Sequence, residues 1–304
     1  MTEGAKRVAV IDVGTNSTRL LVADVADGRV SVLERRSTVT RLGRGVDLSG
    51  RLASEAIEDV CAAIGEYVGI IEELEVETVD AIATSAVRDA DNGSAFIAEL
   101  RERFALSARV LDGEEEARST YLGATSEDLP TEPTLVVDIG GGSTELVLGD
   151  ASGPVVSQSM DIGSVRLHER HLADDPPTPE QVRACVDDID AHLDACPVPV
   201  ATAGTVVGVA GTVLSITAGV LDLATYDKGV LDQSVVAVDD VHAFVERLVA
   251  MPVARRLEFG WMHPGRVDVL GAGGLILARV LARCATTSLV ASEADILDGI
   301  AWSM

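Results

Sequence analysis

Apolar and polar residues alternate over three segments near the start of the chain, in the way that a half-buried strand requires. The segments are 7–12, 18–25 and 29–39, and the dipeptide Asp27-Gly28 before the third is a hairpin-turn signal. This pattern predicts three strands, the last two of which are joined by a tight turn.

Helix and strand patterns alternate through the rest of the first half. Apolar residues recur at helical spacing in the longer segments, and the short apolar runs are typical of buried strands. The predicted order is helix 52–72, strand 78–84, helix 94–104, strand 108–112 and helix 114–125. The segment 127–133 contains Pro130 and Pro133 and indicates a linker.

The pattern of the first strands returns after this linker. Residues 10–24 read VIDVGTNSTRLLVAD and residues 136–150 read VVDIGGGSTELVLGD, so Asp12 corresponds to Asp138 at an offset of 126 residues. A period of this length excludes a solenoid. It predicts a duplicated α/β lobe, with mixed sheets flanked by helices.

We therefore expect an N-terminal lobe over 1–128 and a C-terminal lobe over 129–304. The last helix is expected to cross back to the first lobe, and the two glycine turns are expected to face each other across an interdomain cleft. The second lobe continues with strand 157–164, helices 163–171 and 179–195, a strand, turn and helix over 206–219, a turn and helix over 266–282, and a closing helix over 292–302.

Composition narrows the class of protein. Hydrophobic residues make up 47% and charged residues 24%, as in a packed globular chain. The net charge of −25 makes a nucleic-acid partner unexpected. Because Lys6 and Lys228 are the only lysines, an anionic substrate must be held by arginines, backbone N–H groups or a metal.

The expected location is the cytoplasm. No apolar stretch reaches the length of a membrane-spanning helix, and the first apolar run is too short for a signal peptide. The four cysteines form no CxxC pair, so neither a disulfide framework nor a zinc site is expected.

The repeated turns DVGTNST (12–18) and DIGGGST (138–144) carry the candidate chemistry. Glycine lets backbone N–H groups approach a ligand closely, and successive N–H groups form an anion-binding nest. An aspartate at the end of the preceding strand can hold hydrated Mg²⁺. A third glycine turn, 208–212, runs into a helix whose N-terminus favours phosphate, although a packing glycine at a strand–helix corner is the equally weighted alternative.

Two further features point to catalysis. Asp112 and Glu115 fit a capping-box-like pair at the positive end of a helix, which leaves Glu116 able to point elsewhere, including into a cleft. Arg88 follows a buried strand and is a candidate phosphate clamp, because a guanidinium binds phosphate bidentately. A solvated arginine and ordinary helix-end acids are the alternatives. Weaker candidates for the clamp are Arg41, Arg44, Arg118 and Arg166.

With these residues together, the chain resembles the exopolyphosphatase and guanosine pentaphosphate phosphatase family, in its short two-domain form. The matching segments are VIDVGTNSTRLLVAD, ATSAVRDADN, LDGEEEARSTYLGA, VVDIGGGSTELVLGD, MDIGSVRL, GVAGTVLSI and ADILDGI, which span the chain in family order. The resemblance implies the actin-like (ribonuclease H-like) fold of the actin, chaperone ATPase and sugar kinase superfamily.

The resemblance also implies a reaction, in which water attacks the terminal phosphoryl group of inorganic polyphosphate with the aid of Mg²⁺, or Mn²⁺ as the alternative ion. It places the general base at Glu116, with Arg88 beside it, and the metal-side carboxylates at Asp138 and Glu145. It further implies a homodimer. The expected phosphate contacts are Asp12, Gly14, Asn16, Ser17, Thr18, Gly140, Gly141, Gly142, Ser143, Gly211 and Thr212.

Long family members continue into an extra helical domain, whereas this sequence ends at Met304, so a preference for shorter polyphosphate is expected. Three other functions stay open at this point: hydrolysis of guanosine pentaphosphate, an ATPase or small-molecule kinase of the same fold, and a non-catalytic polyphosphate sensor. Walker and Rossmann phosphate motifs do not fit, because neither lysine follows a suitable glycine and Ile276 stands where GxGxxG needs its third glycine.

Overall fold

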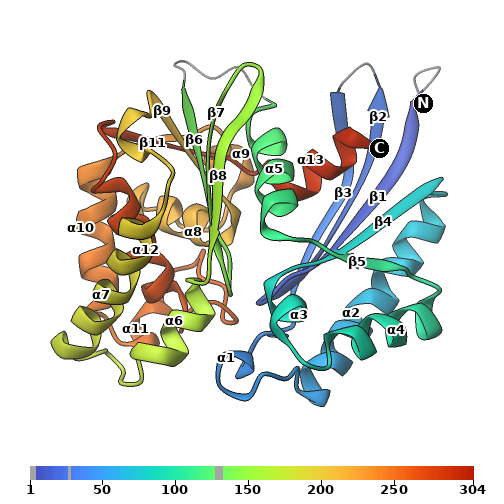
Figure 1. Ribbon diagram of the computed structural model, residues 1–304, viewed down its shortest axis with the longest axis horizontal. Helices are drawn as coiled ribbons and strands as arrows, with labels where there is room; N and C mark the ends of the chain where they lie inside the picture. Colours follow the sequence, from blue (N-terminus) through green and yellow to red (C-terminus); the bar gives the residue numbers. More distant parts are fainter. Residues whose placement is uncertain (1–4, 27–28, 127–132) are drawn as a thin grey trace. The chain divides into compact units, whose positions relative to one another are not determined.

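The computed structural model describes residues 5–26, 29–126 and 133–304 (Figure 1). These form two compact units. The first comprises Met1–Gly123 with Ile296–Met304, and the second comprises Ala124–Asp295. The predicted boundary between 128 and 129, most of the predicted linker and the Asp27-Gly28 turn lie outside the described residues.

The first unit is built on a five-stranded mixed sheet with the order β3-β2-β1-β4-β5. Strand β1 pairs antiparallel with β2 and parallel with β4, and β4 pairs parallel with β5. The strands are β1 (Lys6–Val13), β2 (Ser17–Ala26), β3 (Arg29–Val39), β4 (Thr78–Ala83) and β5 (Ala108–Val110).

Helices cover both faces of this sheet. They are α1 (Val46–Ser49), α2 (Ser54–Glu73), α3 (Ser85–Asp89), α4 (Gly93–Phe104), α5 (Gly113–Ala124) and α13 (Ile296–Ser303). Alternate residues of β1 point to opposite faces. Ile11 therefore packs with Ile64 of α2 and Phe96 of α4, whereas Val10 packs with Ile300 of α13. The closing helix, drawn in red beside the blue strands in Figure 1, is thus part of the first unit.

The second unit repeats this topology around a six-stranded sheet with the order β10-β11-β9-β6-β7-β8. Strand β6 pairs antiparallel with β7 and parallel with β9, as β1 does with β2 and β4. The strands are β6 (Thr134–Ile139), β7 (Thr144–Asp150), β8 (Gly153–Met160), β9 (Thr205–Val209), β10 (Val235–Ala237) and β11 (Ser288–Ala291). The predicted α/β fold with two related mixed sheets is confirmed.

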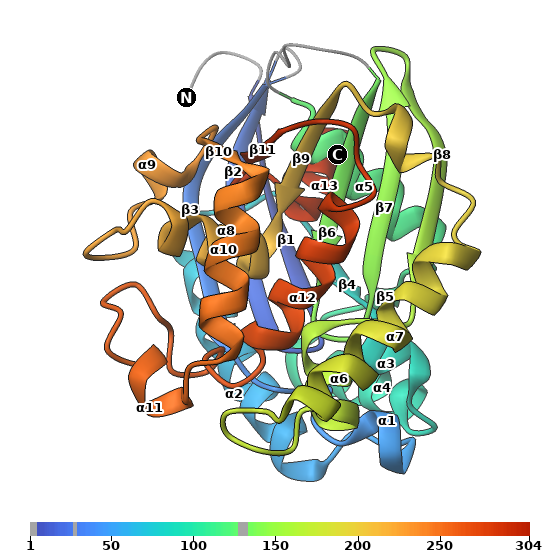
Figure 2. The ribbon, with the colours of Figure 1, turned by 90° about the vertical axis from the view of Figure 1, so that its left-hand side faces the viewer.

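The helices of the second unit build its larger core. They are α6 (Ser164–His171), α7 (Pro179–Ala195), the 3₁₀ turn η1 (Val200–Thr202), α8 (Ala210–Val220), α9 (Lys228–Leu231), α10 (Val238–Val249), α11 (Val253–Arg256) and α12 (Leu270–Leu281). Ile216 of α8, Phe244 of α10 and Ile276 of α12 are buried in one cluster. Figure 2 looks onto the side of this unit where α10 and α12 lie.

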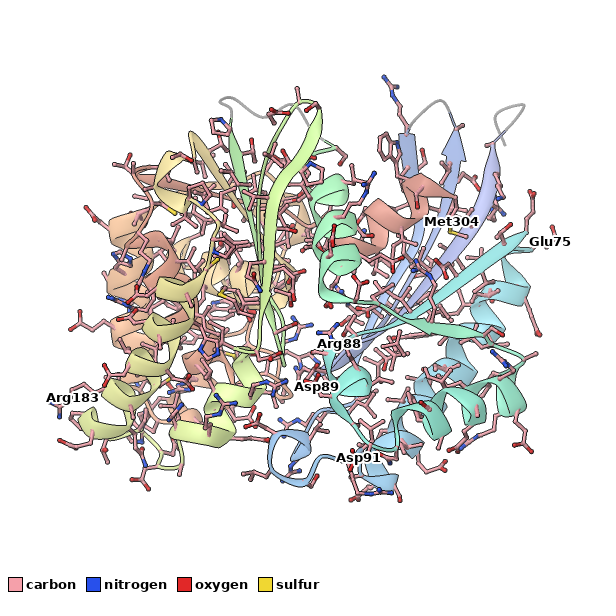
Figure 3. The ribbon with its side chains drawn as sticks, viewed as in Figure 1. Glu75, Arg88, Asp89, Asp91, Arg183 and Met304 are labelled. Atoms are coloured by element: carbon pink, nitrogen blue, oxygen red, sulfur yellow. The ribbon has the colours of Figure 1, made fainter. Side chains whose placement is uncertain are left out.

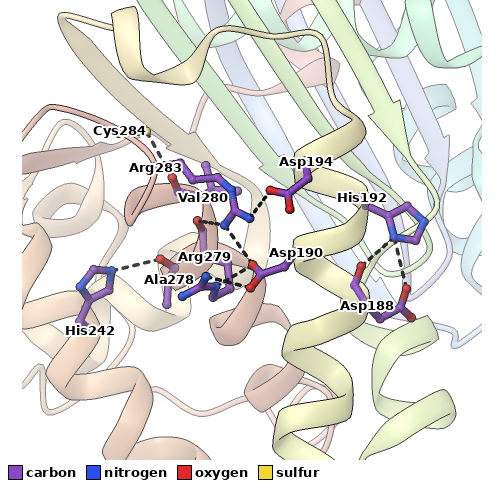
Figure 4. Close-up of polar contacts among 10 residues, drawn as sticks. All are labelled: Asp188, Asp190, His192, Asp194, His242, Ala278, Arg279, Val280, Arg283 and Cys284. Carbon is purple, nitrogen blue, oxygen red and sulfur yellow. Dashed lines mark hydrogen bonds and ion pairs between the residues drawn. The ribbon is translucent and has the colours of Figure 1, made fainter.

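An ion-pair network joins α7 to α12 (Figure 4). The Asp190 carboxylate accepts two hydrogen bonds of 2.8 Å from Arg279 and one of 3.0 Å from Arg283. Arg283 also donates to Asp194 at 2.8 Å. Burial by itself would raise the pKa of Asp190, but the hydrogen bonds from the two arginines outweigh it and hold that pKa below its usual value.

Several elements of the structure differ from those predicted from the sequence. The strand expected over 157–164 is Gly153–Met160, because the chain leaves the sheet at Asp161 and Ser164 opens α6. The turn expected at 208–212 is instead the end of β9 and the first turn of α8, which begins at Ala210 directly after that strand. Strand β11 and helix α10 were not anticipated. None of the helices in the described part of the chain is both long and apolar enough to cross a membrane.

Candidate active site

In the first unit, three of the expected site segments leave the sheet at the same edge. Strands β1, β4 and β5 run parallel, and the glycine turn, α3 and α5 follow their carboxyl ends. Ligands of open α/β sheets bind outside the carboxyl ends of such strands. Asp12, Arg88 and Glu116 are thereby brought to one edge, and Figure 3 labels Arg88 on α3.

The first glycine turn is closed by a hydrogen bond of 3.1 Å from the Gly14 N–H to the Ser17 carbonyl. A Cβ atom at Gly14 would lie 2.8 Å from that carbonyl oxygen, so the turn requires glycine here. The Asn16 carbonyl accepts from the N–H groups of Thr40 and Arg41 at 3.1 and 3.0 Å. Because this carbonyl is bound by the segment that follows β3, we expect an approaching anion to meet N–H groups of the turn.

Asp12 and Thr18, both expected at phosphate, have partners inside the first unit. Arg19 donates to the Asp12 carboxylate through Nε at 2.8 Å and through Nη2 at 2.6 Å. The Thr18 hydroxyl is completely buried and shares a hydrogen bond of 3.0 Å with the Thr40 hydroxyl. Asp12 and Arg19 thus connect β1 to β2, whereas Thr18 connects β2 to the residue that follows β3.

Glu116 lies inside the first unit, whereas the other acids at the start of α5 face outward. Asp112 caps the helix, since its Oδ1 accepts from the Glu115 N–H at 2.8 Å, and the Glu115 side chain pairs with Arg109. The capping part of the predicted box is therefore present. Only 7% of Glu116 is exposed. Its Oε2 accepts a hydrogen bond of 3.2 Å from Arg88 Nη1, which also donates to the Leu111 carbonyl at 2.9 Å.

The second unit holds its glycine turn in the same way. The Gly140 N–H donates to the Ser143 carbonyl at 3.0 Å. The carbonyl groups of Gly140 and Gly141 accept from the first N–H groups of α6, and Arg166 Nε donates to the Gly142 carbonyl at 2.8 Å. Helix α6 can approach this closely only because its N-cap is Gly163, where a Cβ atom would lie 2.5 Å from the Gly141 carbonyl carbon.

Asp138 and Glu145 are direct cross-strand partners on β6 and β7. Their side chains therefore share one face of the sheet, with Cβ atoms about 4.5–5.5 Å apart. Both are buried, and Glu145 Oε1 accepts from the Ser159 hydroxyl at 2.6 Å. Two hard carboxylate donors beside a glycine turn fit Mg²⁺, which takes one or two carboxylates and completes its shell with waters and phosphate oxygens.

These two carboxylates do not fit an ion whose whole coordination shell must come from protein side chains. Within residues 5–26, 29–126 and 133–304, no group of three or more His, Cys, Asp or Glu side chains is arranged to hold a metal ion.

Gly211 and Thr212 lie at the carboxyl edge of the second sheet, in the first turn of α8. The Arg266 guanidinium packs on Gly211, where a Cβ atom would lie 2.5 Å from the guanidinium carbon. Sequence reasoning missed Arg266 as a basic group at this edge. No local pattern links it to Gly211, because the two are far apart in the chain and only the fold brings them together.

Glycine turns and carboxylates at the carboxyl ends of parallel strands are typical of proteins that bind phosphate groups. The sequence matches the model of the Ppx/GppA phosphatase family over residues 21–304, and the chain belongs to this family. Exopolyphosphatase 2 of Mycobacterium tuberculosis is 40% identical over 314 residues, which cover 98% of each chain.

Solved structures agree with this assignment. The crystal structure of an exopolyphosphatase-like protein has a TM-score of 0.95 and 41% identity, covering 99% of this chain and 98% of that one. The Ppx/GppA family member of Aquifex aeolicus has a TM-score of 0.83 and 31% identity, covering 98% and 97%. The predicted family is confirmed. The roles of individual site residues, the expected cleft and the homodimer stay predictions.

Proposed function

We propose that this chain is an exopolyphosphatase that releases terminal orthophosphate from inorganic polyphosphate by Mg²⁺-dependent hydrolysis. The observation that carries the proposal is the buried Glu116 carboxylate, held by Arg88 at the edge where the first glycine turn lies. The name of the 40% identical mycobacterial relative supports polyphosphate as the substrate.

Phosphoryl transfer depends mainly on positioning and on stabilising charge. In the proposed reaction, a water oxygen forms a bond to the terminal phosphorus while the bridging P–O bond breaks. Glu116 accepts the proton that the water loses, and the shortened chain leaves with its oxygen negatively charged. Arg88 both orients Glu116 and provides positive charge for the transferring group.

The glycine turns would bind the phosphate oxygens. Backbone N–H groups at 15–17 and 141–143, together with the first turn of α8 at Gly211 and Thr212, are the proposed donors. Asp138 and Glu145 would hold Mg²⁺, with Mn²⁺ as the alternative. When bound, such an ion neutralises charge on the phosphate oxygens. Ser159 would keep the Glu145 carboxylate in place through its hydrogen bond.

The test is phosphate release in Mg²⁺ buffer from polyphosphates of graded length, with guanosine pentaphosphate and ATP as parallel substrates. Terminal hydrolysis produces orthophosphate from the first time points, and the polymer shortens gradually on a gel. Release from guanosine pentaphosphate alone would instead support that substrate. Transfer from ATP to an acceptor would indicate a kinase, and binding without any release would indicate a sensor.

Two variants connect this test to the proposed residues. Glu145→Gln should raise the Mg²⁺ concentration needed for half-maximal release, because one metal-side carboxylate is lost. Asp187→Asn removes an exposed carboxylate of the same unit and should leave that concentration unchanged. A Glu145→Gln enzyme with the wild-type Mg²⁺ dependence would remove Glu145 from the metal site.

The homodimer that the family resemblance implies is a separate prediction. Measurement of the molar mass by light scattering tests it.

A further inference from the structure

A pair of buried hydroxyl groups joins the first glycine turn to α3. The Thr15 hydroxyl shares a hydrogen bond of 2.8 Å with the Ser85 hydroxyl, and the two residues are 7% and 2% exposed. Thr15 lies within the turn 12–18, and Ser85 is the first residue of α3. The bond therefore connects two segments that are 70 residues apart in the chain and that leave the sheet at the same edge.

The direction of the Thr15 side chain is fixed by the segment that follows β3. The Thr15 carbonyl accepts from the Gly43 N–H at 2.8 Å. The Thr15 methyl group packs on Gly43, where a Cβ atom would collide with it. Because threonine has few allowed side-chain rotamers, packing of the methyl group also sets the direction of the hydroxyl group toward Ser85.

On the other side of the bond, α3 carries the arginine of the candidate site. The helix comprises only Ser85–Asp89. Residues three apart on a helix are neighbours on its surface, so Arg88 lies on the side of α3 where Ser85 lies. Arg88 in turn donates to Glu116 at 3.2 Å. The glycine turn is thereby connected through α3 to the carboxylate that is the proposed general base.

The matching position of the second unit has no side chain. The repeat offset of 126 residues places Gly141 at the position of Thr15. The Gly141 carbonyl accepts from the N–H groups of Val165 and Arg166 in α6, so backbone groups hold this turn. The hydroxyl pair is therefore a feature of the unit that carries the proposed general base and is not required by the repeated strand pair.

We propose that Thr15 and Ser85 are positioning residues, whose hydrogen bond sets the place of Arg88 relative to the first glycine turn. This inference rests on the proposed function, in which the turn binds phosphate oxygens and Arg88 orients Glu116. Displacement of a reacting group by about 1 Å can lower the rate about 10²-fold. The pair acts on turnover more than on binding, because the N–H groups that hold the substrate belong to the turn itself.

The test uses Thr15→Val, which removes the hydroxyl group and keeps the branched shape, and Ser85→Ala. Each should lower kcat for orthophosphate release about 10- to 100-fold and change KM for polyphosphate by less than about threefold. The double variant should be no slower than either single variant, because all three lack the same bond. If Thr15→Val does not fold, Ser85→Ala decides the matter.

Thr15→Ser makes the reciprocal change, since it removes the methyl group and keeps the hydroxyl group. It should retain a kcat within about threefold of the wild-type value. A Thr15→Ser enzyme as slow as Thr15→Val would assign the effect to packing on Gly43 and would overturn the proposal. So would a rise in KM with unchanged kcat in Thr15→Val, because the hydroxyl group would then act in substrate binding.

Thr38→Val is the matched control. The Thr38 hydroxyl on β3 shares a hydrogen bond of 2.9 Å with the Tyr67 hydroxyl of α2, so the same chemical change removes a similar bond from the same unit. This bond does not involve α3, and Thr38→Val should keep the wild-type kcat even if its unfolding midpoint falls. Equal losses of kcat in Thr38→Val and Thr15→Val would contradict a positioning role, since any lost hydroxyl bond would then suffice.

Amide hydrogen exchange gives a second measurement that does not depend on turnover. Peptides that cover 85–90 should exchange faster in Thr15→Val than in the wild type or in Thr38→Val, because α3 has lost its bond to the turn. Unchanged exchange over these residues would overturn the proposal. Faster exchange in Thr15→Val, combined with a wild-type chain that releases no orthophosphate, would contradict the proposed function and leave the link between the turn and α3 established.

Discussion

Glu116→Gln is the variant that examines the proposed chemistry most directly. Glutamine has the shape of glutamate and keeps one side-chain oxygen that can accept the 3.2 Å hydrogen bond from Arg88. Arg88 also keeps its 2.9 Å bond to the Leu111 carbonyl. What the substitution removes is the negative charge and the ability to accept a proton from water.

Two free energies can be compared for this change. The lost charge turns the ion pair with Arg88 into a hydrogen bond from the guanidinium to a neutral amide oxygen, a loss of about 1 kcal/mol of stability, which a domain stable by about 5–15 kcal/mol tolerates. Loss of a general base lowers the rate by a factor of about 10²–10⁴. At about 1.36 kcal/mol per tenfold, this factor corresponds to about 2.7–5.4 kcal/mol of activation free energy. The effect on rate should therefore exceed the effect on stability.

The assay measures orthophosphate release under saturating polyphosphate, together with thermal unfolding and equilibrium binding of polyphosphate. We expect Glu116→Gln to fold and to bind polyphosphate like the wild type while its turnover falls by about 10²–10⁴-fold. Glu114→Gln is the matched control, because it makes the same change at an exposed position in the same turn of α5. Its turnover should stay within a factor of two or so of the wild type.

Turnover of Glu116→Gln close to the wild-type value would remove Glu116 from the mechanism. A turnover loss matched by an equal loss of folded protein would show that the carboxylate has a structural role. Equal losses of turnover in Glu114→Gln and Glu116→Gln would assign the effect to the negative charge at the start of α5 and not to the Glu116 carboxylate itself.

Two further outcomes follow from packing and from charge. Gly163→Ala should lower the free energy of unfolding by about 1–3 kcal/mol and impair phosphate release, because its Cβ atom would collide with Gly141. Gly69→Ala is the control: it adds a Cβ atom on open helix surface and should leave stability unchanged or raise it in thermal unfolding. Asp190→Asn should lower the free energy of unfolding most near neutral pH, and by progressively less as the pH falls below about 4. The hydrogen bonds that lower the pKa of Asp190 stabilise the fold fully above the ordinary carboxyl pKa, and this contribution is lost as Asp190 becomes protonated. The exposed Asp187→Asn serves as its control, and a constant difference across this pH range would contradict the reasoning.

Much of the fold followed from periodicity and from the repeated segment. The alternation around Asp12 and Asp138 predicted the same strand pair twice, and both pairs are present. Asp112 was predicted as a helix cap from its spacing to Glu115, and it caps the helix. These predictions succeeded because the interactions concerned are local in sequence or repeat within it.

Contacts between distant segments were beyond such reasoning. That Arg19 neutralises Asp12 depends on the cross-strand register, which a turn of unknown geometry does not reveal. That Arg266 packs on Gly211 depends on the path of the chain through three intervening helices. Strand β11 is only four residues long, too short for alternation to distinguish it from a loop.

Helix α13 packs against α5, the helix that carries Glu116. Its Gly299 lies so close to α5 that a Cβ atom would come within 2.9 Å of the Ser119 carbonyl carbon, one turn after Glu116, and Asp298 pairs with Arg35 at 2.5 Å. One face of the first sheet is therefore completed by a segment that follows the whole second unit in the sequence. The first unit consequently cannot be assembled from one continuous stretch of the chain, because the second unit is inserted before its closing helix.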